Sequence, residues 1–88
     1  LCIGFNDLAG SMGLSGQVND ARVIAAAEAV LEKTRQTDKT IGIAMGHDRQ
    51  AIAHWLDRGL QWISLGGDFN LLYAKLREIA EDVRTLPR

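Results

Sequence analysis

The sequence predicts an α/β fold of three consecutive strand–helix units, which together make up residues 1–88 as one unit with no linker or separate domain. Three short apolar stretches, each ended by glycine or a polar residue, alternate with segments whose apolar residues recur at the spacing of one helix face. Short strands that alternate with helices of about 10–16 residues are typical of a parallel sheet with right-handed crossovers.

The first unit begins with a buried strand at Leu1–Gly4. The following stretch, Phe5–Val18, is rich in glycine and serine and is predicted to be a loop. Asn19 or Asp20 then caps a helix over about 21–35 by accepting a bond from a free backbone N–H. Its solvent side is expected to carry Glu28, Glu32, Lys33 and Arg35, and its apolar face Val23, Ile24, Ala27, Val30 and Leu31.

The second unit starts with the strand Thr40–Met45, whose apolar character is continuous rather than alternating. That pattern favours a parallel strand covered on both faces. Asp48 is placed to cap the next helix, over about 49–58, and Gly59 is placed to end it in a left-handed conformation. The inner stripe of this helix is predicted to be Ile52, Trp55 and Leu56.

The third unit pairs the strand Gln61–Leu65 with a final helix over about 69–84, capped by Asp68. Its predicted apolar face is Leu72, Leu76, Ile79, Ala80 and Val83. The length of the three units suits a (β/α)₈ barrel, but a barrel needs eight such units and roughly 250 residues. The sequence therefore predicts one segment of a barrel.

Composition excludes several classes of partner. Ten Lys and Arg residues balance eleven Asp and Glu residues, and no basic patch stands out, so we expect no nucleic-acid partner. No apolar run approaches the roughly 20 residues of a membrane span, and no signal peptide is visible.

The one cysteine, Cys2, is predicted to be a small buried residue in a cytoplasmic protein. Trp55 and Trp62 are predicted core residues, and His54 a surface residue.

Candidate chemistry lies where the predicted strands end. Asp7 follows the first strand, where a carboxylate either ligates a divalent cation or caps its own turn. Gly46 and Gly66–Gly67 follow the other two strands and suit either a phosphate site or tight turns. His47 could act as a base there, but an exposed loop position is favoured.

Gly10, Gly13 and Gly16 are spaced G-x-x-G-x-x-G. This spacing matches neither the dinucleotide-binding nor the P-loop fingerprint, so they indicate a flexible loop.

Three stretches of this chain resemble the C-terminal third of the HpcH/HpaI aldolase family. They are GFNDLAGSMGLSGQVND at 4–20, TIGIAMG at 40–46 and RGLQWISLGGDFNLL at 58–72. The G-x-x-D-L pattern at Gly4–Leu8 is the most specific of these motifs. The resemblance covers about Ile3 to Val83, which is nearly the whole chain.

The resemblance implies a (β/α)₈ barrel that cleaves 4-hydroxy-2-oxo acids to pyruvate and an aldehyde with a bound Mg²⁺, Mn²⁺ or Co²⁺ ion. Asp7 matches the family's aspartate metal ligand, and the backbone N–H groups of Asn6 and Asp7 match those that receive the pyruvate carboxylate. Ala44 would lie near the wall on the aldehyde side. Family members form oligomers, often with the last helix exchanged between subunits.

Two departures qualify this expectation. Phe5 stands where the family commonly has proline. The family's glutamate ligand, catalytic histidine and arginine all match positions upstream of residue 1, and His47 does not match that histidine. We therefore expect no catalytic base here, weak or no metal binding, and no activity for these 88 residues alone.

Two alternatives to the aldolase segment remain. The first is an assembly module, in which open sheet edges and apolar helix faces drive homo-oligomerisation that completes the barrel. The second is a phosphate-binding barrel segment that uses Gly46 and Gly66–Gly67, although no basic residue stands beside these glycines.

Overall fold

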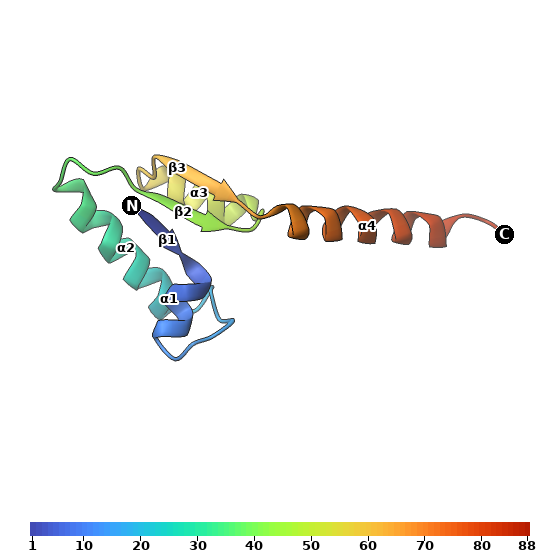
Figure 1. The fold of residues 1–88 in the computed structure, drawn as a ribbon, viewed down its shortest axis with the longest axis horizontal. Helices are drawn as coiled ribbons and strands as arrows, with labels where there is room; N and C mark the ends of the chain where they lie inside the picture. The colour runs from blue at the N-terminus through green and yellow to red at the C-terminus, as the bar shows by residue number, and fades with distance from the viewer.

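The computed structural model describes residues 1–88. Three parallel strands form one sheet in the order β1–β2–β3, and four helices accompany them (Figure 1). The strands are β1 Cys2–Gly4, β2 Gly42–Met45 and β3 Trp62–Leu65. The helices are α1 Phe5–Ser11, α2 Ala21–Arg35, α3 Arg49–Asp57 and α4 Asp68–Thr85. The predicted α/β fold with a parallel sheet is confirmed.

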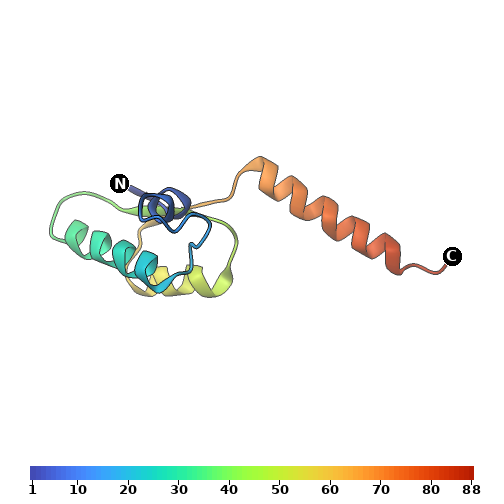
Figure 2. The ribbon, with the colours of Figure 1, turned by 90° about the horizontal axis from the view of Figure 1, so that it is seen from below.

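The core lies between one face of the sheet and helices α2 and α3, which cover the same side (Figure 2). Ile3, Ile43 and Ile63 pair in register across the three strands, and Ile43 is fully buried. Because strand side chains alternate between faces, this row of isoleucines occupies a single face of the sheet. The buried apolar residues are Ile3, Phe5, Ala9, Leu14, Val23, Ala27, Leu31, Ile41, Ile43, Trp55 and Leu60.

The other face of the sheet is not covered by a helix of this chain (Figure 2). A Cβ atom at Gly42 would overlap the Trp62 ring, so the indole lies directly over this glycine. Trp62 is 40% exposed and Cys2 is also exposed. The prediction that both residues are buried is therefore wrong, because both belong to the strand positions that alternate with the isoleucines.

Two predicted helix caps are confirmed. Asp20 accepts a bond from the Arg22 N–H at 2.9 Å, and Asp48 accepts one from the Ala51 N–H at 3.1 Å. Gly59 has a φ of +86°, the left-handed conformation expected after α3. The prediction that Asp68 caps the last helix is wrong by one residue, since Gly67 is the cap of α4 and Asp68 is its first residue.

The predicted loop over Phe5–Val18 contains a helix, α1. Phe5 and Ala9 are both buried and lie four residues apart, so they share one helix face that packs against the core. This tertiary contact outweighs the local preference of a glycine- and serine-rich sequence for a loop. Gly13 and Gly16, with φ of +73° and +78°, form the turn region after α1.

Helix α4 projects from the rest of the molecule (Figures 1 and 2), and the whole chain measures 61 × 27 × 20 Å along its principal axes. None of its residues is buried. The helix itself is confirmed, but its apolar face packs against nothing in this chain. Leu56 of α3 and Val30 of α2, which were predicted on inner faces, are likewise exposed. No helix is long and apolar enough to cross a membrane.

Candidate functional site

The carboxyl ends of the three strands lie along one edge of the sheet, because all pairs are parallel. In α/β folds this edge is where ligands bind. Each strand leads into a helix there: β1 directly into α1, β2 through Gly46–Asp48 into α3, and β3 through Gly66–Gly67 into α4.

Asp7 lies in the first turn of α1, close to the end of β1. A Cβ atom at Gly4 would stand 3.0 Å from the Oδ2 atom of Asp7, so the carboxylate rests over this glycine. The side chain is exposed and takes part in none of the chain's ion pairs. Asp7 therefore presents an unpaired carboxylate at the strand edge.

The backbone N–H groups of Asn6 and Asp7 belong to the same first turn. N–H groups of a first turn have no acceptor within the helix, and the helix dipole makes this end partly positive. The N–H groups of Asn6 and Asp7 and the carboxylate of Asp7 therefore lie together at the carboxyl end of β1. Phe5, at the first position of α1, holds this turn in place, because its buried ring packs against Trp55 with centroids 5.4 Å apart.

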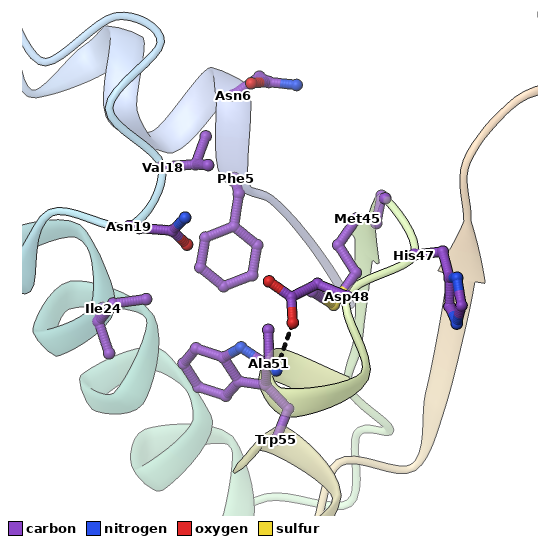
Figure 3. A pocket seen from close by; sticks show the side chains of 12 residues that line it. Phe5, Asn6, Val18, Asn19, Ile24, Met45, His47, Asp48, Ala51 and Trp55 are labelled. Atoms are coloured by element: carbon purple, nitrogen blue, oxygen red, sulfur yellow. Dashed lines mark hydrogen bonds between the residues drawn. The ribbon is translucent and has the colours of Figure 1, made fainter. Parts of the chain in front are cut away.

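A hollow of about 250 Å³ lies beside this turn, on the helix-covered side of the strand ends (Figure 3). Asn6 and the half-buried Ala44 line it, whereas Asp7 does not. Its full lining is Phe5, Asn6, Val18, Asn19, Ile24, Ala44, Met45, Gly46, His47, Asp48, Ala51 and Trp55. The lining contains no lysine or arginine, so the hollow offers no cationic partner for a phosphate.

His47 is exposed, as predicted, and Figure 3 shows its ring pointing away from Phe5 and Trp55. The structure therefore does not bring His47 together with the other polar side chains of the hollow.

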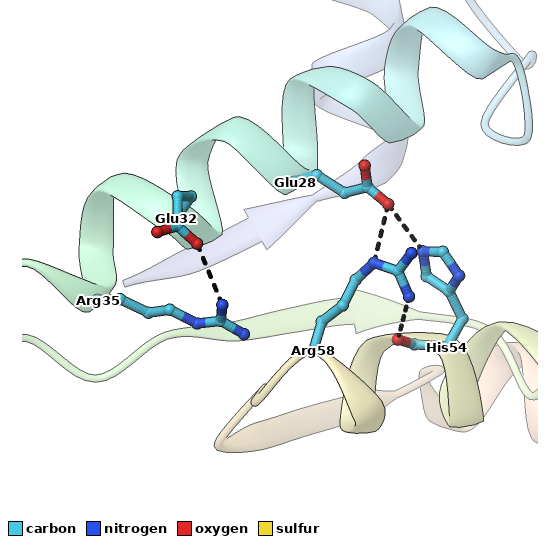
Figure 4. Close-up of polar contacts among 5 residues, drawn as sticks. All are labelled: Glu28, Glu32, Arg35, His54 and Arg58. Carbon is cyan, nitrogen blue, oxygen red and sulfur yellow. Dashed lines mark hydrogen bonds and ion pairs between the residues drawn. The ribbon is translucent and has the colours of Figure 1, made fainter.

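A polar cluster joins α2 to α3 on the outer surface (Figure 4). Glu28 accepts a bond from Arg58 at 2.9 Å and lies 3.2 Å from the Nε2 atom of His54. The His54 ring also meets Trp55 edge-on at 4.9 Å. His54 and Glu28 lie at the surface, as predicted, but their side chains are only about one third exposed because they contact each other. No local pattern signals this cluster, because it joins residues 26 and 30 positions apart.

Asp20 pairs closely with Arg22 at the start of α2. Hydrogen bonds from the Arg22 side chain and backbone lower the pKa of Asp20 from 3.8 to about 2. The same pair raises the pKa of Arg22. This pair serves the start of α2 and lies outside the strand-end site.

The metal expected from the family resemblance needs several oxygen ligands. No three His, Cys, Asp or Glu side chains of the chain are grouped so that they could hold an ion together. This chain therefore offers one candidate metal ligand, Asp7, and does not form a metal site by itself.

Comparison with known proteins places this geometry in a larger fold. No protein-family model and no curated protein matches the sequence. An HpcH/HpaI aldolase from Desulfitobacterium hafniense matches 98% of the chain with a TM-score of 0.88 and 22% identity. An HpcH/HpaI aldolase/citrate lyase family protein from Burkholderia cenocepacia matches 97% with a TM-score of 0.86 and 29% identity. The chain spans 33% of the length of each.

The resemblance to HpcH/HpaI aldolase structures is thus confirmed at the level of the fold. The chain is an α/β segment that matches part of such a barrel, consistent with a C-terminal portion.

Proposed function

We propose that this chain is the C-terminal third of a metal-dependent HpcH/HpaI aldolase, which cleaves a 4-hydroxy-2-oxo acid to pyruvate and an aldehyde. The fold match to one third of two such structures supports the family. The observation that carries the proposal is the arrangement at the end of β1. There the unpaired carboxylate of Asp7 and the first-turn N–H groups of Asn6 and Asp7 share one edge of the sheet.

The roles follow from this chemistry. The N–H groups of Asn6 and Asp7 donate to the carboxylate of the 2-oxo acid, and the positive end of the α1 dipole favours that charge. The Asp7 carboxylate supplies one oxygen ligand to a Mg²⁺, Mn²⁺ or Co²⁺ ion. When bound, such an ion stabilises negative charge on the keto oxygen as a Lewis acid. The other ligands and the catalytic base would come from the part of the barrel that this segment does not include.

Because one carboxylate binds a divalent ion weakly, the 88 residues alone should be catalytically silent. The binding role of Asp7 is therefore tested separately from turnover. In the ¹⁵N-labelled chain, Mn²⁺ added with pyruvate should broaden the amide resonances of Asn6 and Asp7 first. Asp7→Asn should remove this selective broadening, because it removes the charged ligand.

Asp68→Asn is the matched control for this titration. Asp68 is also an exposed carboxylate in the first turn of a helix that follows a strand. Broadening that survives Asp7→Asn but disappears in Asp68→Asn would contradict the proposal.

Turnover is measured as exchange of the pyruvate methyl protons with D₂O, followed by NMR. The pure chain should give no metal-dependent exchange above the metal in buffer. Exchange that Asp7→Asn abolishes would refute the expected silence of the segment while supporting the role of Asp7. Exchange that Asp7→Asn leaves intact would refute that role.

A second candidate function is assembly, which a specific feature of α4 favours. Its exposed apolar residues follow an alternating three- and four-residue spacing, the pattern of a helix that pairs with another along a seam. They are Phe69, Leu72, Leu76, Ile79 and Val83, each between 48% and 76% exposed. We propose that α4 and the bare sheet face are covered in a homo-oligomer, with α4 exchanged between copies.

Light scattering tests this candidate. The chain should be a dimer or larger, and Leu76→Gln should shift it toward the monomer. Arg77→Gln, a change on the polar side of the same helix, should have little effect, since Arg77 pairs with Glu81 of its own chain. A monomer at high micromolar concentration would refute the assembly proposal and leave the aldolase proposal standing.

A further inference from the structure

The helix-covered face of the sheet is less well covered at β3 than at β2. Ile43 is fully buried, whereas its partner in register, Ile63, is only partly buried. Leu65 is 46% exposed and lies on the same face, because it stands two residues beyond Ile63. The helices of this chain therefore leave part of β3 open on the side where α2 and α3 pack (Figure 2).

Helix α3 adds an exposed apolar residue beside this part of β3. Its residue His54 contacts Glu28 of α2, so that flank of α3 faces α2. Leu56 is two residues further along and therefore about 200° around the helix, on the opposite flank. Because α2 connects β1 to β2 and α3 connects β2 to β3, the flank away from α2 lies on the β3 side of the sheet. Leu56, which is 52% exposed, thus joins Ile63 and Leu65 in one apolar surface, the β3 surface.

Helix α4 carries a matching apolar face. Five of its apolar residues follow the seam spacing, and none of its residues is buried. The five are Phe69, Leu72, Leu76, Ile79 and Val83. The helix leaves β3 along the direction of the strand, through Gly66–Gly67, and so extends away from the β3 surface of its own chain (Figure 1). An α4 that covers this surface therefore comes from another copy.

We propose that the β3 surface receives α4 from a second copy of this chain. The inference rests on the assembly candidate proposed above and adds the place where the exchanged helix docks. The opposite, bare face of the sheet suits a helix less well, because Gly4 and Gly42 contribute no side chain there and the Trp62 ring lies over Gly42. Right-handed crossovers also place successive helices on the side where α2 and α3 already pack. Two copies that exchange α4 reciprocally form a closed two-fold dimer.

Light scattering tests the docking with two matched substitutions. Leu56→Gln should raise the dissociation constant about tenfold per docked helix, and hence about a hundredfold for a dimer with two such contacts. Val30→Gln is the control, because Val30 is also an exposed apolar residue of a helix but lies outside the β3 surface. A monomeric wild type would refute the assembly candidate and the docking together. A dimer that Leu56→Gln leaves intact, or that Val30→Gln weakens as much, would refute the docking alone.

A mixed dimer identifies the surface that α4 covers. Cys2→Ser removes the native thiol, and Ala74→Cys, an exposed position of α4 outside the seam, carries a nitroxide label. This chain is refolded together with a ¹⁵N-labelled Cys2→Ser chain that has no nitroxide. In the ¹⁵N-labelled chain, the backbone amide of Leu56 should broaden more than the indole N–H of Trp62. The proposal is overturned if Trp62 broadens more, which places α4 on the bare face, or if broadening is confined to α4.

Discussion

Phe5 joins the first turn of α1 to α3, and its removal should weaken both the fold and the strand-end site. The residue is 7% exposed, and its ring packs on Trp55 with centroids 5.4 Å apart and planes tilted by 49°. Truncating a buried phenylalanine to alanine costs about 3–5 kcal/mol. A chain of this length has a total stability of roughly 4–13 kcal/mol. Phe5→Ala should therefore remove a large part of that stability, and Phe5→Leu about 1–2 kcal/mol, chiefly the aromatic contact.

Urea unfolding followed by circular dichroism measures both changes. Leu86→Ala is the control, because Leu86 is 62% exposed, lies beyond the end of α4 and should change the free energy of unfolding by less than about 0.5 kcal/mol. If Phe5→Ala costs no more than Leu86→Ala, then α1 is not held through this contact. The account of how Asn6 and Asp7 are positioned would then fail.

Three further predictions concern single polar groups and one glycine. The lowered pKa of Asp20 contributes stability that is present above its ordinary value of 3.8 and lost as pH falls through about 2. The difference in melting temperature between wild type and Asp20→Asn should therefore shrink over that pH range. Glu28→Gln should cost about 0.5–1 kcal/mol in urea unfolding, because it weakens the contacts to Arg58 and His54. Glu32→Gln, at the more exposed pair with Arg35, should cost less. Gly4→Ala should displace the Asp7 carboxylate, since the new Cβ would stand 3.0 Å from Oδ2. The selective Mn²⁺ broadening at Asn6 and Asp7 should then decrease.

The parts of the fold that were predicted correctly depend on local signals. Asp20, Asp48 and Gly59 act within a few residues of where they stand, and the apolar strands end at glycine or polar residues. The sheet order follows from the strand–helix–strand crossovers, which place successive parallel strands side by side. The first turn of α1 was missed because its stability comes from Phe5 and Ala9 packing against distant elements, which no window of local sequence reports.

Only part of the candidate site could be predicted, because local sequence does not report contacts between distant elements. Asp7 could be placed at a strand end from sequence, but its position in a helix turn could not. The contact between the Phe5 and Trp55 rings, which positions that turn, joins residues 50 positions apart, so no local pattern reports it. Trp62 was predicted in the core because it is a large aromatic residue, yet it lies on the sheet face that no helix of this chain covers.

Helix α4 has a consequence for how this chain behaves in solution. None of its 18 residues is buried, whereas most of the stability of a helix in a protein comes from the packing of its apolar face. In the proposed homo-oligomer, the folding of α4 into a helix is linked to association, so the magnitude of the mean residue ellipticity at about 222 nm should increase with protein concentration. Dilution should then unfold α4 while β1–β3, α2 and α3 remain folded.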